Sequence, residues 1–499
     1  MKLHRLILLA SYFLLLGSFA KAADSTQRKN NYKYPPASVT KHSITLGGQK
    51  INYTAKAGHL LTLNSKGESK GLFFHVAYTR DGMETGKRPI TFVFNGGPGS
   101  SSVWLHMGAL GPKKVAMKED GTAINPPYAI SDNEYSWLDK TDLVFIDPIE
   151  TGYSRPAEDV DKKEFTGYNE DIESIGDFIQ KYVSMEGRWA SPKYLAGESY
   201  GTTRAVGLSG YLQDRHGMYL NGLVLISAVL NFQTLHFTSG NDLPYALFVP
   251  SYAASAYFHG KINKQKFPDF AAFLQEVEKF AIGEFTLALA QGDKLSRPEK
   301  TNIAQRLSDY TGLSVEFILS YHLRISTGLF PKELLRQENY SIGRFDATIK
   351  GRDKQQGGSG NEFDPSYNLS IFGAYTMAIN EHLKQNLKFE NPDMVYEILT
   401  GKVHPWNYSN VQNRYLENAE VLRSAIHKNP SLKVLVCNGY YDLATPYFAT
   451  EYTLNHMFLA PEYQSNIRMK YYHGGHMMYT FPSQIGAFTK DVKDFYEGK

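Results

Sequence analysis

Residues 194–201 read Tyr-Leu-Ala-Gly-Glu-Ser-Tyr-Gly, an apolar run that ends in a serine between two glycines. The apolar run predicts a buried strand, and residues 202–212 have the composition of a helix. A tight turn from strand to helix needs glycine, because side chains at the flanking positions would collide. Such a turn exposes the hydroxyl group of Ser199 and directs backbone N–H groups and the positive end of the helix dipole toward it. The stretch therefore predicts a nucleophilic serine at the end of a strand.

Similar short apolar runs occur on both sides of this stretch and are bounded by Gly, Asp or Asn. They lie at 90–94, 143–146, 223–226 and 432–436, and helical patterns separate them. Strands that alternate with helices predict crossover connections and a mostly parallel sheet. In such sheets ligands bind at the carboxyl ends of the strands, so motifs that follow the strands should meet there. Together these patterns predict an α/β-hydrolase fold with a mostly parallel central sheet.

The rhythm of strands and helices stops between residues 231 and 370. Here 267–289, 299–310 and 315–323 carry apolar residues at helical spacing, and 351–360 is polar and rich in glycine. We predict a mainly helical cap insertion at 231–370. It would divide the hydrolase core into a first part at 41–230 and a second part at 371–499.

The N-terminus has the pattern of an export signal. Basic residues precede the apolar run at 6–20, and Ala20-Lys21-Ala22 has the small residues of a cleavage site. We expect residues 1–22 to be a cleaved signal peptide and 23–40 to be a flexible leader. An uncleaved anchor is the alternative, but the run is shorter than the roughly 20 residues that span a bilayer. The expectation is a secreted or periplasmic protein with no stable membrane association after cleavage.

The composition limits the partners and the cross-links of the chain. A net charge of +3 over 499 residues, without a block of Lys and Arg, argues against nucleic acid as a partner. Cys437 is the only cysteine, so the chain cannot form an intrachain disulfide. An exported protein without disulfides favours a bacterial source. Neither charge nor aromatic content identifies the ligand, and the sequence does not give the oligomeric state.

A nucleophilic serine needs a base and an acid that orients this base, and in this fold they follow in the order Ser, Asp, His. Asp442 follows the predicted strand at 432–436, and His476 follows the apolar run at 467–472. We therefore predict a triad of Ser199, Asp442 and His476. Asp442 as a helix cap, and His473 with His476 as a metal pair, are the alternatives. Because no cluster of carboxylates or cysteines lies nearby, we expect neither a metal nor another cofactor.

A glycine-rich turn, Asn95-Gly-Gly-Pro-Gly, follows the predicted strand at 90–94 and precedes a run of serines. A phosphate-binding loop is the competing interpretation, but the Gly-Lys-Ser/Thr of such a loop is missing. Glycines let backbone N–H groups approach a carbonyl oxygen closely, and this early loop supplies one donor in α/β-hydrolases. We predict an oxyanion hole made of the N–H groups of Gly97 and Tyr200.

Four blocks of the chain together resemble the serine carboxypeptidase family, in a bacterial-type member. They are Asn95-Gly-Gly-Pro-Gly, Ile146-Asp-Pro-Ile-Glu-Thr-Gly-Tyr-Ser, Gly197-Glu-Ser-Tyr-Gly and Gly475-His-Met. The resemblance implies that the protein removes the C-terminal residue of peptide substrates through an acyl-enzyme. It also implies that Asn95 and Glu198 bind the terminal carboxylate of the substrate. A carboxyl group must be protonated to donate to a carboxylate, so such a site favours acidic pH.

The chain departs from the pattern of this family at Val93, Ser100 and Ala109, where the family has Trp, Cys and Glu. The change at Ala109 removes a partner for the terminal carboxylate, and Glu150 is a candidate to replace it. An esterase, another peptidase and an acyltransferase on the same triad therefore stay open. A binding protein on an inactive hydrolase scaffold is the alternative from a different class.

Overall fold

The computed structural model describes residues 34–355 and 357–499. The expected signal peptide at 1–22 and most of the expected leader at 23–40 lie outside these residues. The last residues of the leader belong to a strand, because β1 begins at Ser38 and pairs with β2. The leader therefore ends earlier than expected.

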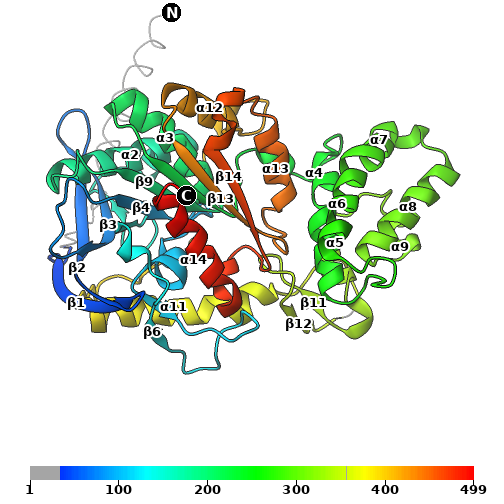
Figure 1. The fold of residues 1–499 in the computed structure, drawn as a ribbon, viewed down its shortest axis with the longest axis horizontal. Helices are drawn as coiled ribbons and strands as arrows, with labels where there is room; N and C mark the ends of the chain where they lie inside the picture. Colours follow the sequence, from blue (N-terminus) through cyan, green and yellow to red (C-terminus); the bar gives the residue numbers. More distant parts are fainter. Residues whose placement is uncertain (1–33, 356) are drawn as a thin grey trace, which may run out of the picture. The chain divides into compact units, whose positions relative to one another are not determined.

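A 10-stranded sheet, in the order β1-β2-β3-β7-β4-β9-β10-β13-β14 with β8 beside β3, forms the centre of the fold (Figure 1). Its strands are β1 Ser38–Leu46, β2 Gln49–Leu63, β3 Ser69–Arg80, β4 Ile90–Phe94, β7 Asp142–Ile146, β8 Arg155–Pro156, β9 Lys193–Glu198, β10 Gly222–Ile226, β13 Lys433–Gly439 and β14 Ile467–Tyr472. All pairs from β7 to β14 along this order are parallel, whereas β1, β2, β3 and β7 pair antiparallel. The predicted α/β-hydrolase fold with a mostly parallel sheet is confirmed.

The antiparallel strands β1 to β3 were not among the predicted strands. In β1, half-buried or buried positions alternate with exposed ones, so the strand has no continuous apolar run. The parallel strands β4, β7 and β10 are buried at every position, as expected for strands with helices on both faces. Continuous burial explains why the parallel strands were recognisable as apolar runs.

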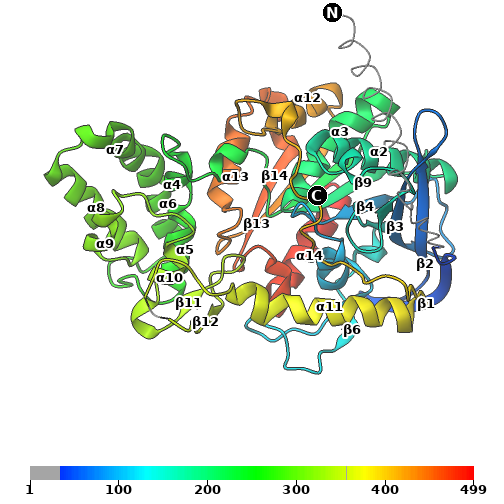
Figure 2. The same ribbon diagram turned by 180° about the vertical axis from the view of Figure 1, so that it is seen from behind.

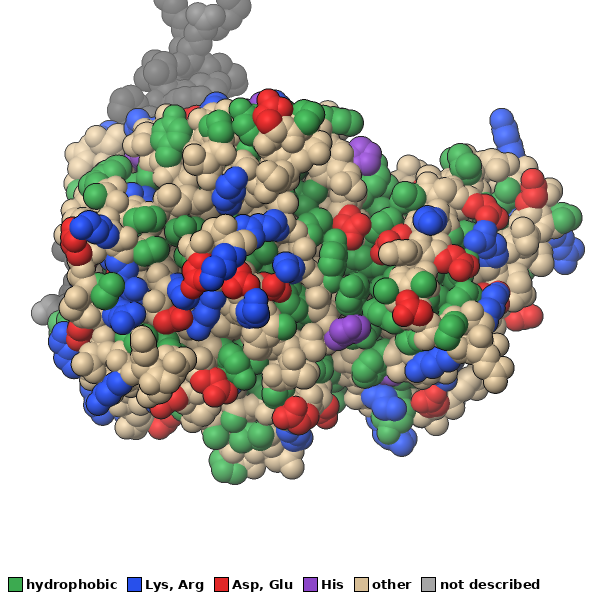
Figure 3. Space-filling model, in the orientation of Figure 1, with side chains coloured by type: hydrophobic (Ala, Val, Ile, Leu, Met, Phe, Trp, Pro, Cys, Tyr) green, Lys and Arg blue, Asp and Glu red, His purple; other side chains and the backbone are tan. Residues whose placement is uncertain are grey.

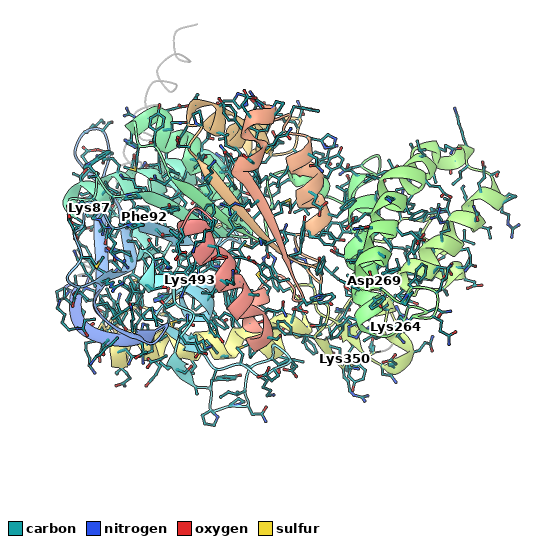
Figure 4. The ribbon with its side chains drawn as sticks, in the orientation of Figure 1. Lys87, Phe92, Lys264, Asp269, Lys350 and Lys493 are labelled. Atoms are coloured by element: carbon teal, nitrogen blue, oxygen red, sulfur yellow. The ribbon has the colours of Figure 1, made fainter. Side chains whose placement is uncertain are left out.

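Helices cover both faces of the sheet (Figures 1 and 2). On one face lie α2 Tyr168–Met185, α3 Tyr200–His216 and α12 Ala419–Lys428, and on the other α11 Phe372–Glu381 and α14 Pro482–Tyr496. Neighbouring strand residues belong to different cores: Leu195 packs with Phe92 (Figure 4) and the α2 face, and Ala196 packs with the α14 face. The short α1 Val103–Leu105 follows β4, and α13 Tyr447–Asn455 follows β13.

A group of helices is inserted between β10 and β13, with a hydrophobic core of its own. Its helices are α4 Leu243–Leu247, α5 Val249–Phe258, α6 Phe270–Phe280, α7 Thr286–Gln291, α8 Arg297–Thr311, α9 Val315–Ser320 and α10 Phe330–Glu333. Helix α6 begins after Asp269 (Figure 4), whose carboxylate accepts a hydrogen bond of 2.7 Å from the N–H of Ala272. The core of this insertion includes Tyr447 and Phe448, so the insertion packs against α13.

Two small hairpins complete the described structure. They are β5 Lys113–Val115 with β6 Ile130–Asp132, and β11 Ser341–Ile342 with β12 Lys350–Gly351. Within the described residues, none of the helices combines the length and the apolarity that a membrane crossing requires. On the face shown in Figure 3, basic and acidic side chains are interspersed.

Candidate active site

Ser199 lies in the turn between β9 and α3. Its backbone has a φ of 59° and a ψ of −129°, a conformation that costs a residue other than glycine about 1–3 kcal/mol. A Cβ atom added to Gly197 would lie 2.1 Å from the carbonyl oxygen of Gly201, so only glycine fits this position. The turn holds the side chain of Ser199 at the wall of a cavity. The sequence-predicted turn from strand to helix is therefore present.

Asp442 and His476 meet at this cavity, in the loops that follow β13 and β14, and His476 lines its wall. The Oδ2 atom of Asp442 lies 2.7 Å from Nδ1 of His476. The other carboxylate oxygen, Oδ1, accepts the backbone N–H groups of Ala444 at 2.7 Å and Thr445 at 2.9 Å. The hydroxyl of Thr445 donates to Oδ2 at 2.8 Å. With Nδ1 donating to the carboxylate, Nε2 of His476 is left as the proton acceptor.

The surroundings of His476 favour its protonated form. Burial alone would lower the pKa of this imidazole, but the charge and the hydrogen bond of Asp442, followed by the charge of Glu198, raise the pKa above its usual value. The charge of Arg344 acts in the opposite direction and lowers this pKa. The imidazole is thus a stronger base than a free histidine, which suits proton transfer from a hydroxyl group.

Glu198 is buried beside Ser199 and is held from two sides. The amide of Asn95 donates to its Oε1 atom at 3.1 Å, and the hydroxyl of Tyr479 donates to its Oε2 atom at 2.5 Å. Burial raises the pKa of this carboxyl group to about 7, although the charge of His476 and both hydrogen bonds act to lower it. Near neutral pH, Glu198 can therefore exist in a protonated form that donates a hydrogen bond.

The glycine-rich turn after β4 packs directly against the start of α3. A Cβ atom on Gly96 would lie 2.4 Å from the backbone nitrogen of Tyr200 and 2.9 Å from Cβ of Ser199. Tyr200 is the first residue of α3, so its N–H group has no acceptor within the helix. Gly97 and Tyr200 both line the cavity next to Ser199. The two predicted oxyanion donors thus lie at the same site.

Residues 344–347 of the insertion, here called segment 344–347, contact the loops that carry Asp442 and His476. The hydrogen bonds run from Leu443 N–H to Arg344 O (3.0 Å), His476 N–H to Phe345 O (2.6 Å), Gly475 N–H to Asp346 Oδ2 (2.6 Å) and Ala347 N–H to Tyr441 O (3.0 Å). The ring of Phe345 lies 5.3 Å from that of His476. The insertion therefore holds both loops and forms part of the site.

The cavity in front of Ser199 has a volume of about 280 Å³. Most of its walls are apolar or aromatic, from Trp104, Val229, Phe232, Leu235, Phe345, Tyr367, Ile371, Leu399 and Met477. Its polar lining includes Glu198, Ser199, His236, Arg344, Thr445 and His476. Apolar walls around a few polar groups are typical of a pocket for an organic ligand.

The structure places some sequence-predicted residues elsewhere. Glu150, the candidate to replace the missing glutamate, lies in the turn after β7 and does not line the cavity in the described structure. His473 contacts the hydroxyl of Tyr441 at 3.1 Å. Ala109 is buried, and a Cβ atom on its neighbour Gly108 would lie 2.6 Å from the ring of Tyr479. Tyr479 therefore occupies the space next to Gly108.

The sequence did not predict the roles of Tyr479, Thr445 and segment 344–347. Thr445 follows Asp442 by three residues, a spacing typical of local side-chain hydrogen bonds, so this contact had a weak signal. Tyr479 lies just beyond the last recognised block, in a sequence without a distinctive pattern. Segment 344–347 had no signal, because its contacts with the loops use mainly backbone atoms.

Comparisons with known proteins agree with these observations. A model of the family described as serine carboxypeptidase matches residues 47–495. Serine carboxypeptidase-like 33 of Arabidopsis thaliana is 29% identical over 141 residues, which cover 26% of this chain and 26% of that protein. The carboxypeptidase Y homolog of Arthroderma benhamiae is 30% identical over 215 residues, which cover 42% of this chain and 39% of that protein. The alignments thus span well under half of these relatives.

Solved structures that match the chain in the comparison include a juvenile hormone epoxide hydrolase from the silkworm Bombyx mori. It has a TM-score of 0.35 and 12% identity, and the match covers 89% of this chain and 78% of that one. A lipase in its open form has a TM-score of 0.36 and 13% identity, over 89% of this chain and 98% of the other. Because the family model matches nearly the whole chain, the chain belongs to the serine carboxypeptidase family.

Proposed function

We propose that the protein is a serine carboxypeptidase that hydrolyses the C-terminal peptide bond of peptides. The observation that carries this proposal is the cavity itself, in which Ser199 and His476 line the walls together with Glu198. The hydroxyl of Ser199 can attack a carbonyl group, and the buried carboxyl group of Glu198 can bind the terminal carboxylate of a peptide. No cofactor is needed for this chemistry.

In the proposed mechanism Ser199 is the nucleophile, His476 the general base and Asp442 the acid that orients the imidazole. The Ser199 hydroxyl attacks the scissile carbonyl while Nε2 of His476 accepts its proton. The N–H groups of Gly97 and Tyr200 stabilise the oxyanion of the tetrahedral intermediate. His476 then protonates the leaving amine, and a water molecule hydrolyses the acyl-enzyme by the reverse proton transfers.

The terminal carboxylate of the substrate is proposed to bind Asn95 and Glu198. A protonated Glu198 donates to this carboxylate, whereas an ionised Glu198 repels it, so binding should weaken as pH rises through the pKa of about 7. His476 must be neutral to accept a proton, and its pKa is raised, so turnover should also fall toward acidic pH. Since each group shifts the pKa of the other, the two titrate as a coupled pair.

The proposal is tested with two peptides of the same sequence, one with a free C-terminal carboxylate and one amidated. We expect cleavage of the free acid only, with a bell-shaped dependence of kcat/KM on pH whose alkaline limb lies near pH 7. Equal cleavage of both peptides, or cleavage of simple esters alone, would contradict carboxypeptidase activity and favour another hydrolase function.

The variant Glu198→Gln separates the two limbs of this profile. The amide donates to a carboxylate at any pH, so the alkaline limb should disappear. Loss of the negative charge also removes a contribution that raises the pKa of His476, so the acid limb should move to lower pH. An unchanged alkaline limb would exclude Glu198 from carboxylate binding.

Gly96 offers a test of the proposed oxyanion hole. In Gly96→Ala the new Cβ would collide with backbone atoms of Glu198 and Tyr200, at 2.8 and 2.4 Å, which cannot move without shifting the turn around Ser199. We expect kcat to fall by about a hundredfold or more, the typical effect of a lost oxyanion donor. Gly86→Ala is the matched control, since its Cβ would meet only Ala190, at 3.6 Å. The kcat values are measured with thermal unfolding in parallel. Equal values in Gly96→Ala and Gly86→Ala would contradict the proposed oxyanion hole.

We also propose that the protein is exported, on the basis of the sequence pattern at 1–22. The N-terminal sequence of the protein purified from its own host tests this directly. A mature N-terminus after Ala22 is expected, and a retained Met1 would exclude cleavage.

A further inference from the structure

Arg344 brings a positive charge to the cavity. It is the one lysine or arginine among the described residues that line this pocket. Its backbone is fixed on both sides, because its N–H donates to the carboxylate of Asp364 at 3.2 Å and its carbonyl oxygen accepts from Leu443 at 3.0 Å. The side chain itself is exposed to solvent. Because its backbone is held in place and its guanidinium group is accessible, Arg344 can contact a ligand in the cavity.

The guanidinium group of Arg344 lies over an aromatic ring that in turn lies next to His476. It is positioned over the ring of Phe345, with its Cζ atom 5.4 Å from the ring centroid. The Phe345 ring in turn lies 5.3 Å from the imidazole of His476. The charge of Arg344 also lowers the pKa of His476. Arg344 and Ser199 line the same cavity, so a peptide that extends along this cavity from Ser199 can contact Arg344.

The charge of Arg344 has no anionic partner among the side chains that the structure describes. Across residues 34–355 and 357–499, no Asp or Glu side chain forms an ion pair with Arg344, whereas Arg324 and Arg336 in the same insertion are paired. The neighbouring walls of the cavity are apolar, including Phe345, Tyr367 and Leu399. A guanidinium group binds carboxylates well, because its planar donors match both oxygens.

We infer that Arg344 binds a carboxylate group of the peptide substrate at the cavity. The inference rests on the proposed carboxypeptidase function and adds a residue of the insertion to the substrate-binding groups. Two sources of this carboxylate share the same chemistry. One is the C-terminus of the peptide, which Arg344 would hold together with Asn95 and Glu198, and the other is an acidic side chain in the last two residues.

The experiment compares wild type with Arg344→Gln on two N-blocked peptides with free C-termini. The peptides are identical except for Gln or Glu in the last two positions. Each kcat/KM value is divided by the rate at which a fluorophosphonate labels Ser199, because labelling needs no carboxylate and reports the reactivity of the serine. A charge-assisted hydrogen bond to a carboxylate corresponds to about a ten- to hundredfold change in this ratio.

The two sources give different results. A fall of this size for both peptides assigns Arg344 to the terminal carboxylate, and a fall for the Glu peptide alone assigns it to an acidic side chain. A ratio that changes less than twofold for both peptides would overturn the inference. If wild type labels with the fluorophosphonate but cleaves neither peptide, the proposed function fails instead.

Two further variants separate charge recognition from structural damage. Arg344→Lys keeps the charge but loses the planar fork, so its ratio should lie between those of wild type and Arg344→Gln. Arg352→Gln is the matched control, because Arg352 is also exposed and lies over an aromatic ring, that of Tyr340 at 4.6 Å, but does not line the cavity. An equal fall in Arg352→Gln would also overturn the inference.

Discussion

Replacing Ser199 by alanine is expected to lower kcat by about 10⁶-fold, the loss found when the nucleophile of a triad is removed. Ser199 lies at the wall of the cavity in a strained turn, and the hydroxyl is the atom that forms the acyl-enzyme in the proposed mechanism. Residual turnover would come from the oxyanion hole and from binding of the substrate alone. The measurement is single-turnover kinetics on a free-acid peptide, together with labelling by a fluorophosphonate.

Ser209→Ala is the matched control for this variant. Ser209 lies in the same helix, α3, is buried, and its hydroxyl donates to the carbonyl of Val206 at 2.7 Å, away from the cavity lining. The Ser209→Ala variant should react with the fluorophosphonate and cleave the peptide at the rates of the wild type. Substantial activity or labelling in Ser199→Ala would exclude Ser199 as the nucleophile. Wild-type protein that is folded but never labelled would instead support a binding protein on an inactive scaffold.

Replacing Asp442 by asparagine is expected to lower kcat by about 10⁴-fold while the fold is kept. The N–H groups of Ala444 and Thr445 bind Oδ1, so the asparagine must place its carbonyl oxygen there and its NH₂ group toward His476. The imidazole would then accept at Nδ1 and carry its proton on Nε2, where it cannot take the proton of Ser199. The kcat is measured beside thermal unfolding.

The pH profile of Asp442→Asn provides a second readout. The charge of Asp442 raises the pKa of His476, so its removal should move any remaining acid limb to lower pH. Asp120→Asn is the control, because Asp120 is exposed and binds only its own turn through Thr122. An Asp442→Asn variant that keeps more than about a tenth of the wild-type kcat would contradict the proposed role, given the usual size of this effect.

The parallel strands and the motifs that follow them could be predicted because each leaves a local trace in the sequence. Strand β4 was predicted at its observed bounds, and β9 and β10 differ only at their ends. Helices on both faces require apolar residues at every position of such strands, so each strand appears in the sequence as a continuous apolar run. Strands β1 and β2 left no such run, because more buried positions largely alternate with more exposed ones. Strand β3 was missed although it is buried at every position from Gly71 to Tyr78.

The partners of the buried carboxyl groups could not be predicted in the same way. Tyr479 follows Glu198 by 281 residues, and the phenol that meets the carboxylate was not part of any recognised block. The same holds for segment 344–347, whose backbone binds the loops of Asp442 and His476. A contact between distant residues depends on how the chain packs, and a single sequence contains no periodic signal for it.

By itself, the sequence determined the kind of fold, the order of its parts and the residues proposed for the chemistry. Those features follow from local requirements: apolar runs for buried strands, glycines where backbones approach closely, and a serine in a strand-to-helix turn. Only the tertiary structure decided that Tyr479 holds Glu198, that Glu150 lies outside the cavity lining, and that Arg344 enters it. These depend on distances between segments far apart in the chain, and packing of the whole core sets such distances.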